Sequence, residues 1–490
     1  MYVQSDGSNK EADVIVVGTG PGGLGAVGAA VEAGSEVIVV EANNRTGGNG
    51  TWSTGWIAFV DSAMQREKGL QDNEEIFLKD CRKLVKEHSH LYGIIWDDTL
   101  AQVFAKNSSK MYDILIAKGM RFTHLIPRPL QASVDRLHAI ESTEMFSEAF
   151  ESDFVGPRTL TYLNSRATGL IVEDGSVKGV HVQPTDGRPR FQARARKGVI
   201  LATGGYQANP ALRARHQLAE SANALYPGLP TCVGDGHILG QAIGGDLINM
   251  GVIPPVIQVA SALVQESIAV NAAGERFHDE AGPYYERVVA LRKQPQLAAH
   301  YIFDADTFRS KRMYVNYFPQ TPISADSLAD LATKIGVPGH VLESSVRQWN
   351  DFMASGSPKD PLTGRVAFSE HRSQICKAPF YAAKMIAGIS LTCGGFVTTT
   401  SMQVVDVFGN PIPGLFAVGD CAGGFTPSAD MGGTHLGGGL VLGWEAGKAV
   451  STGELAQPHT GSSFGVAIPS KIESEPRYRN PIIDVTASKL

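Results

Sequence analysis

The chain has 490 residues, of which 43 % are hydrophobic and 19 % charged, a composition typical of a folded protein with a large core. Its formal net charge of −6 leaves no basic field for nucleic acid. No apolar run reaches the roughly 18 residues that a membrane span requires. The five cysteines contain no CxxC pair, and the histidines form no HExxH motif. We therefore expect no nucleic-acid partner, no membrane span and no metal site.

The first predicted element is a strand that runs into a glycine-rich turn. Residues 13–17, DVIVV, form the apolar run of a strand buried on both faces of a parallel sheet. Gly18, Gly20 and Gly23 follow at GxGxxG spacing. The first glycine can supply the tight turn, the second close approach to a phosphate, and the third close packing of helix on strand.

A helix and a second strand are predicted after this turn. Residues 22–33 are almost all small, and Gly34 follows them as a C-cap glycine would. Residues 37–40 are a second apolar strand, and Glu41 at its end can accept hydrogen bonds from ribose hydroxyls. The pattern predicts a dinucleotide site. The alternative is a glycine-rich corner between strand and helix with no ligand.

A second glycine-rich loop, TGGNGTWSTGW, spans residues 46–56. Loops of this kind bring backbone N–H groups close to an anion or a flat ring. Four glycines and two tryptophans in eleven residues favour a cofactor contact over a plain surface turn.

The middle of the chain mixes helical and strand patterns. Residues 74–122 have apolar residues near helical spacing, and residues 168–183 form a hairpin around the turn EDGS. Arg128, Arg136 and His138 lie between these segments. They could contact a substrate, but we expect them on the surface.

Two more buried strands end in glycine turns, at residues 198–205 and 415–420. If both join the first strand in one sheet, the chain between them carries an insertion. Residues 262–385 have mixed composition and no phosphate-type loop, so we expect them to form a separate cap domain.

Together these segments resemble a known family. The motifs DVIVVGTGPGGLGA, GGNGTWSTGW, VILATGGYQANP, VGDGHILGQAIGG, VNAAGERFHDE and IPGLFAVGDCAGG, followed by HLGGGL, are similar to those of flavoproteins of the soluble fumarate reductase and 3-ketosteroid Δ1-dehydrogenase superfamily. The likeness covers about residues 12–450. It implies an α/β fold in which a Rossmann-like FAD-binding domain of the glutathione reductase type is interrupted by a smaller α+β cap domain.

The resulting domain prediction has three parts. Residues 1–261 and 386–456 would form a discontinuous FAD-binding domain, and residues 262–385 the substrate cap domain. Residues 457–490 would be a tail ending in Ser488-Lys489-Leu490, the peroxisomal import tripeptide. We therefore expect a peroxisomal import receptor as partner and localisation in the peroxisome, or otherwise in the cytoplasm.

The resemblance implies FAD as the cofactor. The first turn and Glu41 would hold its ADP half, the second loop its pyrophosphate, and Asp420 its ribitol hydroxyls. Family relatives with covalent flavin use a histidine in the second loop, and residues 45–56 contain none, so we predict non-covalent FAD. The predicted cofactor-binding residues are Gly18, Gly20, Pro21, Gly22, Gly23, Glu41, Ala42, Gly48, Asn49, Gly50, Thr54, Gly55, Trp56, Thr203, Gly204, Asp235, Asp420, Gly439, Leu440 and Val441.

Three residues are candidate catalytic acids or bases. Steroid dehydrogenases of the family carry a Pro-Tyr where this chain has Tyr284, whereas fumarate reductases carry an arginine. Arg309 lies within about one residue of the acid arginine of the fumarate reductases. His435 stands where those enzymes place a carboxylate-binding arginine, and Leu391 where they place a carboxylate-binding histidine. Each candidate has a structural alternative, since tyrosine and histidine also pack in cores.

The resemblance implies an FAD-dependent oxidoreductase acting on CH–CH bonds, which forms or reduces a C=C bond next to a carbonyl by hydride transfer at flavin N5. Because the carboxylate clamp is missing, we expect a neutral or weakly polar small-molecule substrate of the enone or ketone type. The dehydrogenase direction is favoured, since peroxisomes remove the hydrogen peroxide that reoxidation by oxygen produces. A fumarate reductase-like ene-reductase, a redox-neutral flavin-dependent isomerase and a flavin-binding protein without turnover stay open.

Overall fold

The computed structural model describes residues 2–3, 6–127, 132–217, 224–252, 255–257, 266–295, 298–310, 320–366, 368, 372–428 and 431–456. The side chains of residues 89–92, 255–257 and 284–285 lie outside this description.

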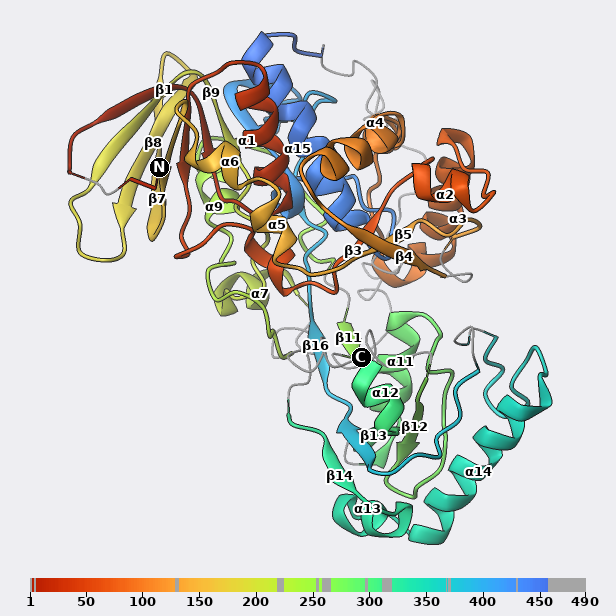
Figure 1. The fold of residues 1–490 in the computed structure, drawn as a ribbon. Coiled ribbons are helices and arrows are strands. Elements are labelled where there is room, and N and C mark those ends of the chain that lie inside the picture. Colours follow the sequence, from red (N-terminus) through yellow and green to blue (C-terminus); the bar gives the residue numbers. More distant parts are fainter. Residues whose placement is uncertain are drawn as a thin grey trace, which may run out of the picture. The chain divides into compact units, whose positions relative to one another are not determined.

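The main sheet is built around β1 (Lys10–Val17), which pairs in parallel with β2 (Val37–Val40) and β9 (Phe191–Leu201). Further parallel pairs join β2 to β6 (Thr159–Tyr162) and β9 to β19 (Pro411–Ala417). The strand order is β18-β19-β9-β1-β2-β6, and β18 (Gln403–Val405) is antiparallel to its neighbour β19 (Figure 1). The strands β7 (Ser165–Glu173) and β8 (Ser176–Pro184) form a hairpin, and β8 pairs with β9. Strands predicted from segments about 400 residues apart therefore do share one sheet.

Two helices pack side by side against this sheet, α1 (Pro21–Glu32) and α15 (Thr434–Thr452), drawn red and blue in Figure 1. A Cβ atom added to Gly443 would lie 2.2 Å from the carbonyl oxygen of Gly22, and one added to Gly447 would lie 2.2 Å from that of Ala26. These glycines are needed because the two backbones touch. As predicted, α1 ends before Gly34, whose φ is +81°.

The rest of this part of the chain adds further helices, two 3₁₀ turns and small sheets. Its helices are α2 (Ala63–Glu67), α3 (Glu74–Tyr92), α4 (Asp98–Ala117), α5 (Met145–Glu148), α6 (Glu151–Val155), α7 (Pro210–His216) and α9 (Asp235–Gln241), with the 3₁₀ turns η1 (Gly48–Trp52) and η4 (Gly419–Cys421). A three-stranded sheet has the order β3 (Trp56–Ala58), β5 (Leu137–Ile140) and β4 (Phe122–Ile126). Two small pairs join β10 (Leu247–Ile248) to β17 (Gly395–Phe396), and β11 (Pro255–Ile257) to β16 (Ala387–Ile389).

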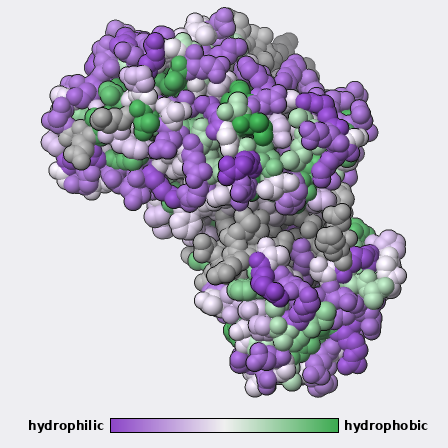
Figure 2. Space-filling view, in the orientation of Figure 1, coloured by the Kyte–Doolittle hydropathy of each residue, from purple (hydrophilic) through white to green (hydrophobic). Residues whose placement is uncertain are grey.

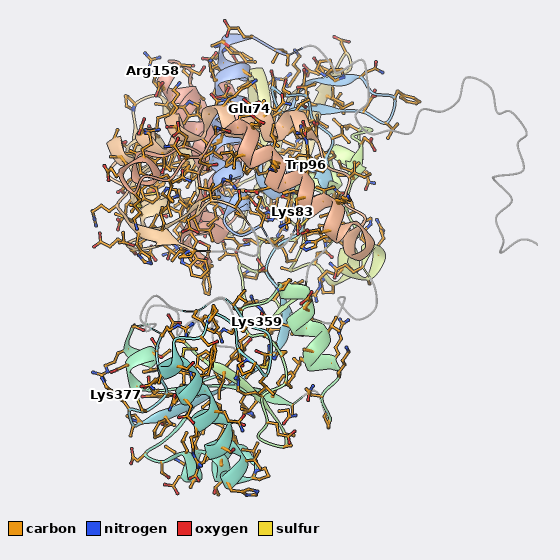
Figure 3. The ribbon with its side chains drawn as sticks, turned by 90° about the vertical axis from the view of Figure 1, so that its right-hand side faces the viewer. Glu74, Lys83, Trp96, Arg158, Lys359 and Lys377 are labelled. Carbon is orange, nitrogen blue, oxygen red and sulfur yellow. The ribbon has the colours of Figure 1, made fainter. Side chains whose placement is uncertain are left out.

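The segment predicted as helical over residues 74–122 contains two helices, α3 and α4. The carboxylate of Asp97 accepts a hydrogen bond from the N–H of Thr99 at 2.8 Å and so caps the start of α4. Phe122 already belongs to β4, so the end of the prediction was wrong. Figure 3 shows Glu74 and Lys83 on α3, and Trp96 in the connection to α4.

The prediction that Arg136 and His138 lie on the surface was wrong, since they are 4 % and 0 % exposed. Arg136 donates two hydrogen bonds of 2.7 Å to Asp72 and one of 2.6 Å to Asp80. The ring of His138 contacts the Ser62 hydroxyl at 2.6 Å, and burial lowers its pKa to about 4. Both charges that compensate Arg136 lie more than fifty residues away in sequence, which is why the local pattern did not reveal its burial. Arg128 lies outside the described residues.

A separate antiparallel sheet comes from the segment predicted to be an insertion. Its strand order is β12 (Ile268–Asn271), β13 (Ala299–Phe303), β15 (Phe380–Lys384) and β14 (Ile323–Ala325). The same segment contributes α11 (Tyr284–Arg292), α12 (Ala305–Ser310), α13 (Leu328–Ile335) and α14 (Gly339–Ser355) (Figure 1). The predicted fold class, a parallel Rossmann-like sheet with a separate α+β part, is confirmed.

The core of this second part contains paired charges. Arg365 donates to Glu280 at 3.0 Å and Arg276 donates to Asp360 at 2.6 Å, while both guanidinium groups lie over the ring of Trp349, at 4.8 and 5.1 Å from its centroid. Burial alone would raise the pKa of Glu280, but Arg276 and Arg365 outweigh it and hold that pKa at about 2. The carboxylate is therefore ionised although it is fully buried.

The face of the molecule in Figure 2 is mostly hydrophilic, with hydrophobic residues in small scattered groups. Among the described residues, no helix is both long and apolar enough to cross a membrane.

Candidate cofactor and active site

A cavity of about 320 Å³ opens where the strands of the main sheet end. Val17, Val40, Ala202 and Val418, which lie at the carboxyl ends of β1, β2, β9 and β19 or directly after them, all line it. Ligands of open parallel sheets bind in this position. The volume is within the roughly 300–1,000 Å³ of small-molecule sites.

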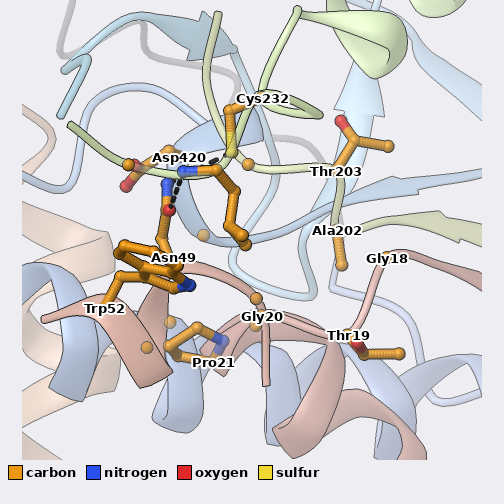
Figure 4. Close-up of a pocket in the computed structure, with 18 of the residues that line it drawn as sticks. Gly18, Thr19, Gly20, Pro21, Asn49, Trp52, Ala202, Thr203, Cys232 and Asp420 are labelled. Atoms are coloured by element: carbon orange, nitrogen blue, oxygen red, sulfur yellow. Dashed lines mark hydrogen bonds between the residues drawn. The ribbon is translucent and has the colours of Figure 1, made fainter. Parts of the chain in front are cut away.

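The glycine turn forms one wall of the cavity (Figure 4). Gly18 has a φ of +97°, and a Cβ there would lie 2.3 Å from the carbonyl oxygen of Ala202. At Gly20 an added Cβ would meet nothing within 4 Å, so this residue faces open space. Gly20 is also the N-cap of α1 and provides no side-chain cap for its first N–H groups. The turn therefore offers backbone donors to an anion such as a pyrophosphate.

Glu41 lines the cavity at the end of β2 and is 4 % exposed. Its carboxylate accepts hydrogen bonds from the N–H and hydroxyl of Thr19, at 2.8 and 2.6 Å, and from the N–H and amide of Asn43, both at 2.8 Å. Burial raises the pKa of Glu41 against the effect of these four bonds. A ribose hydroxyl would share the carboxylate with Thr19 and Asn43.

The second glycine loop is tied to a distant segment through Asn49. Its amide nitrogen donates to the Tyr226 hydroxyl at 2.7 Å and to the Cys232 sulfur at 3.1 Å, and its amide oxygen accepts from the N–H of Leu229 at 3.1 Å (Figure 4). Burial raises the pKa of the Cys232 thiol to about 12, so this cysteine is not a reactive thiolate.

Arg166 contributes a guanidinium to the cavity wall, and this charge is already paired. Arg166 makes a two-bond contact with Asp235, at 2.7 and 2.9 Å. No other lysine or arginine occurs among the described residues that line the cavity.

Asp420 and His435 meet at another part of the wall. Asp420 lies in η4, directly after β19, and His435 lies in the first turn of α15. His435 Nδ1 is 3.3 Å from Asp420 Oδ1, and within the described part of the chain His435 Nε2 is buried without a hydrogen-bond partner. Leu391 and Trp56 line the same cavity. The arrangement offers an oriented imidazole next to apolar walls.

Most of the predicted cofactor-binding residues meet in this cavity. Those that line it are Gly18, Gly20, Pro21, Gly22, Glu41, Ala42, Gly48, Asn49, Gly50, Thr54, Trp56, Thr203, Gly204, Asp235, Asp420 and Gly439. Gly23, Gly55, Leu440 and Val441 are not in its lining. A Cβ on Gly23 would lie 2.1 Å from the carbonyl oxygen of Gly18, so this glycine packs helix against strand, as its place in the motif predicts.

Of the candidate acids and bases, only His435 is brought to the cavity by the described structure. The Arg309 side chain is 71 % exposed and pairs with Asp306 at 2.7 Å, and Asp306 also pairs with Lys377, which Figure 3 labels. Tyr284 begins α11, but its side chain lies outside the description.

Sequence reasoning missed some lining residues within the glycine motifs, such as Thr19 and Trp52, and a second group, namely Asn43, Ser165, Arg166, Ala167, Tyr226, Leu229, Thr231 and Cys232. No residue of this second group belongs to a glycine motif. The one available signal was Asn43, two residues beyond the acidic end of β2.

Comparisons with known proteins agree with this geometry. The family model described as FAD binding domain matches residues 13–436. The chain belongs to this family.

The chain is similar to the probable fumarate reductase Ifc3 of Shewanella frigidimarina, with 29 % identity over 90 % of this chain and 75 % of that protein. It is also similar to the 3-oxosteroid 1-dehydrogenase of Mycolicibacterium smegmatis, with 30 % identity over 60 % of this chain and 58 % of that one. The solved open conformation of a flavocytochrome c3 fumarate reductase matches 91 % of this chain and 79 % of its own, with a TM-score of 0.74 and 28 % identity. The flavoprotein is therefore an FAD-dependent oxidoreductase of the fumarate reductase and ketosteroid dehydrogenase type, acting on CH–CH bonds.

The residues present fit FAD. The open space at Gly20 and the uncapped start of α1 suit the pyrophosphate, and the buried carboxylate of Glu41 suits a ribose. Asp420 follows β19, which is separated from β2 by β9 and β1 in the sheet, and it offers a second hydroxyl acceptor.

Proposed function

We propose that the flavoprotein forms a C=C bond next to a carbonyl in a neutral or weakly polar substrate, with reduction of such a bond as the alternative direction. Bound FAD supplies the hydride acceptor or donor, at N5 of the flavin. The observation that carries the substrate class is the charge of the cavity wall. Arg166, the arginine of the described lining, is paired with Asp235. Leu391 and His435 also line the cavity, at the positions where the similar fumarate reductases have carboxylate-binding residues.

This choice of substrate follows from electrostatics. A carboxylate that loses its water needs a charge-assisted partner, and arginine provides the strongest because its planar fork makes two bonds. A ketone needs only one hydrogen-bond donor, and its hydrocarbon body gains from contact with Trp56 and Leu391.

His435 is the acid or base that we propose for the proton that accompanies hydride transfer. Asp420 orients its ring through Nδ1, so that Nε2 can exchange a proton. Tyr284 stays a second candidate from the sequence, and unchanged turnover of the Tyr284→Phe variant would remove it. Arg309 is a third candidate that would have to leave Asp306 in order to act.

The direction is tested by anaerobic spectroscopy of the FAD-loaded protein. We expect the oxidised flavin to bleach when a saturated 3-oxosteroid is added, since a relative is a 3-oxosteroid 1-dehydrogenase. If instead only reduced protein reacts, by reoxidation with the corresponding enone or with fumarate, the ene-reductase alternative holds. Product formation without any electron acceptor would identify the redox-neutral isomerase.

We also propose that FAD is bound non-covalently, because residues 45–56 contain no histidine and the one cysteine in the cavity lining is held as a thiol. After acid precipitation the yellow colour should stay in the supernatant. A yellow protein pellet would contradict the proposal.

Peroxisomal import rests on Ser488-Lys489-Leu490 alone, which lies outside the described residues. We propose it as a sequence-based prediction. A fluorescent protein carrying residues 457–490 at its C-terminus should collect in peroxisomes, and removal of the last three residues should abolish this.

A further inference from the structure

Residues 226–232 form a strap along one side of the large cavity. Six of its seven residues line the cavity and its first six are at least partly exposed, so the strap lies between the cavity and solvent. Just before it, the carbonyl oxygen of Leu225 accepts a hydrogen bond from the N–H of Ile389 at 2.8 Å. At its end, the carbonyl oxygen of Cys232 accepts one from the N–H of Ala208 at 2.9 Å. Backbone bonds therefore anchor both ends of the strap.

Between these ends, the side chain of Asn49 ties the strap to the second glycine loop. Its amide nitrogen donates to the Tyr226 hydroxyl at 2.7 Å and to the Cys232 sulfur at 3.1 Å (Figure 4). Its amide oxygen accepts from the N–H of Leu229 at 3.1 Å. A Cβ on Gly228 would lie 2.3 Å from the tyrosine hydroxyl, so that ring folds back against the strap. One amide thus contacts three residues of the strap through both its donor and its acceptor.

The loop that carries this amide rests on the glycine turn, since a Cβ on Gly48 would lie 2.7 Å from the Cα atom of Gly20. A second tie lies at the ribose end of the cavity, where the hydroxyl of Thr231 donates to the amide oxygen of Asn43 at 3.2 Å. The amide nitrogen of Asn43 in turn donates to Glu41 at 2.8 Å. The strap is therefore fastened to the two segments whose groups fit the pyrophosphate and the ribose.

We propose that the side chain of Asn49 is a latch that holds residues 226–232 closed along the cofactor, and that opening of this latch lets FAD in and out of the cavity. The latch bonds join protein atoms to protein atoms, so the latch opposes opening of the free and the FAD-loaded protein alike. It therefore slows binding and release together and changes the ratio of their rates, the Kd, much less. Asn49 acts through the strap and is a positioning residue.

The test follows FAD release from the FAD-loaded protein, through the fluorescence of free FAD after dilution. The time course gives the dissociation rate, and the plateau at several dilutions gives the Kd. Because Asn49→Ala loses three hydrogen bonds, we expect it to release FAD at least about tenfold faster, with a Kd within about threefold of the wild-type value. Tyr226→Phe removes one of these bonds and should speed release by about threefold.

The matched control is Asn350→Ala. The amide of Asn350 likewise bonds the backbone of a distant segment, the N–H and carbonyl of Ile375 at 2.8 and 2.9 Å, but it is not part of the cavity lining. Its FAD release should be unchanged. If the Kd of Asn49→Ala rises by the same factor as its dissociation rate, Asn49 is a direct FAD ligand and the latch is refuted. An unchanged rate refutes it too. If Asn49→Ala does not load with FAD, Tyr226→Phe decides by the same two criteria.

Hydrogen exchange tests the latch without any release of FAD. The N–H of Cys232 donates to the carbonyl oxygen of Leu229 within the strap, so its exchange reports opening of the strap rather than loss of the Asn49 bonds themselves. Exchange of this N–H should be faster in FAD-loaded Asn49→Ala than in the wild type and in Asn350→Ala, and equal exchange would contradict the proposal. The release experiment rests on the proposed non-covalent FAD, which acid precipitation tests separately. A covalent flavin would leave the exchange result to decide, and failure of the flavin-bleaching test affects neither readout.

Discussion

The interiors of the cofactor-binding part and of the antiparallel-sheet part of this chain are stabilised by different kinds of contact. Around α1 and α15 the backbones touch, and glycines such as Gly443 exist because a single carbon would collide. Around β12 to β15 the interior instead holds two arginines and two carboxylates against Trp349. The first arrangement depends on the absence of side chains and the second on complete pairing of charge. The two regions should therefore fail under different substitutions.

The largest effect is expected at the helix contact. Gly443→Ala places a Cβ 2.2 Å from a backbone oxygen that belongs to α1, so the two helices must separate. We expect a loss of about 4 kcal/mol or more in the free energy of unfolding, together with loss of FAD, because α1 carries the glycine turn. Denaturant unfolding and flavin absorbance measure both. Gly339→Ala, which meets nothing closer than 3.9 Å, should change stability by less than about 1 kcal/mol.

The second effect concerns the charge network. Arg365→Met removes one of the two guanidinium partners of fully buried Glu280 and should cost about 3–5 kcal/mol, because Arg276 alone then faces two buried carboxylates, Glu280 and Asp360, and one negative charge in the interior stays uncompensated. FAD binding should be retained, in contrast to Gly443→Ala. The stability control is Arg309→Met, which breaks an exposed ion pair and should cost under about 1 kcal/mol. Equal losses for the two arginine variants would contradict this interpretation of the core.

Acid should reveal a third effect, at His138 in the cofactor-binding part and, through the equally lowered pKa of His278, in the antiparallel-sheet part as well. The folded pKa of His138, about 4, lies below the unfolded value of about 6.5, so the unfolded state binds more protons between these pH values. Stability is fully present above pH 6.5 and falls as pH decreases toward 4, by about 3 kcal/mol for this group. Unfolding free energies at pH 7 and pH 4 should thus differ less in His138→Gln than in the wild type. Glu280, whose pKa is lowered from 4.5 to about 2, loses its contribution to stability only between these lower pH values. If the pH 7 to pH 4 difference in unfolding free energy is the same in His138→Gln as in the wild type, another group causes the acid sensitivity.

The structure of the cofactor-binding part could be predicted from the sequence more completely than that of the antiparallel-sheet part. The turn from Gly18 to Gly23, the strand after it and Glu41 are local in sequence, and their geometry follows from steric rules. The meeting of several strand ends at one cavity could also be predicted, because parallel strands align their carboxyl ends.

What could not be predicted depends on contacts between distant segments. Arg166 and Asp235 are 69 residues apart, and Asn49 and Cys232 are 183 apart. A single sequence carries no mark of such pairs. Arg136 looked like a surface residue for the same reason, since only the fold shows Asp72 and Asp80 around it.

The most direct test of the account compares a dianionic alkene with its neutral dimethyl ester, with free reduced FAD as the reference for their different intrinsic reactivity. The flavin of the FAD-loaded protein is reduced anaerobically, and its reoxidation is followed with fumarate and with dimethyl fumarate, the neutral diester. Because the described cavity wall offers no unpaired guanidinium, we predict that the ratio of the diester rate to the fumarate rate is at least about tenfold higher for the protein than for free reduced FAD, which corresponds to about 1.4 kcal/mol of transition-state stabilisation. Faster reoxidation by the dianion would contradict the proposed neutral substrate class.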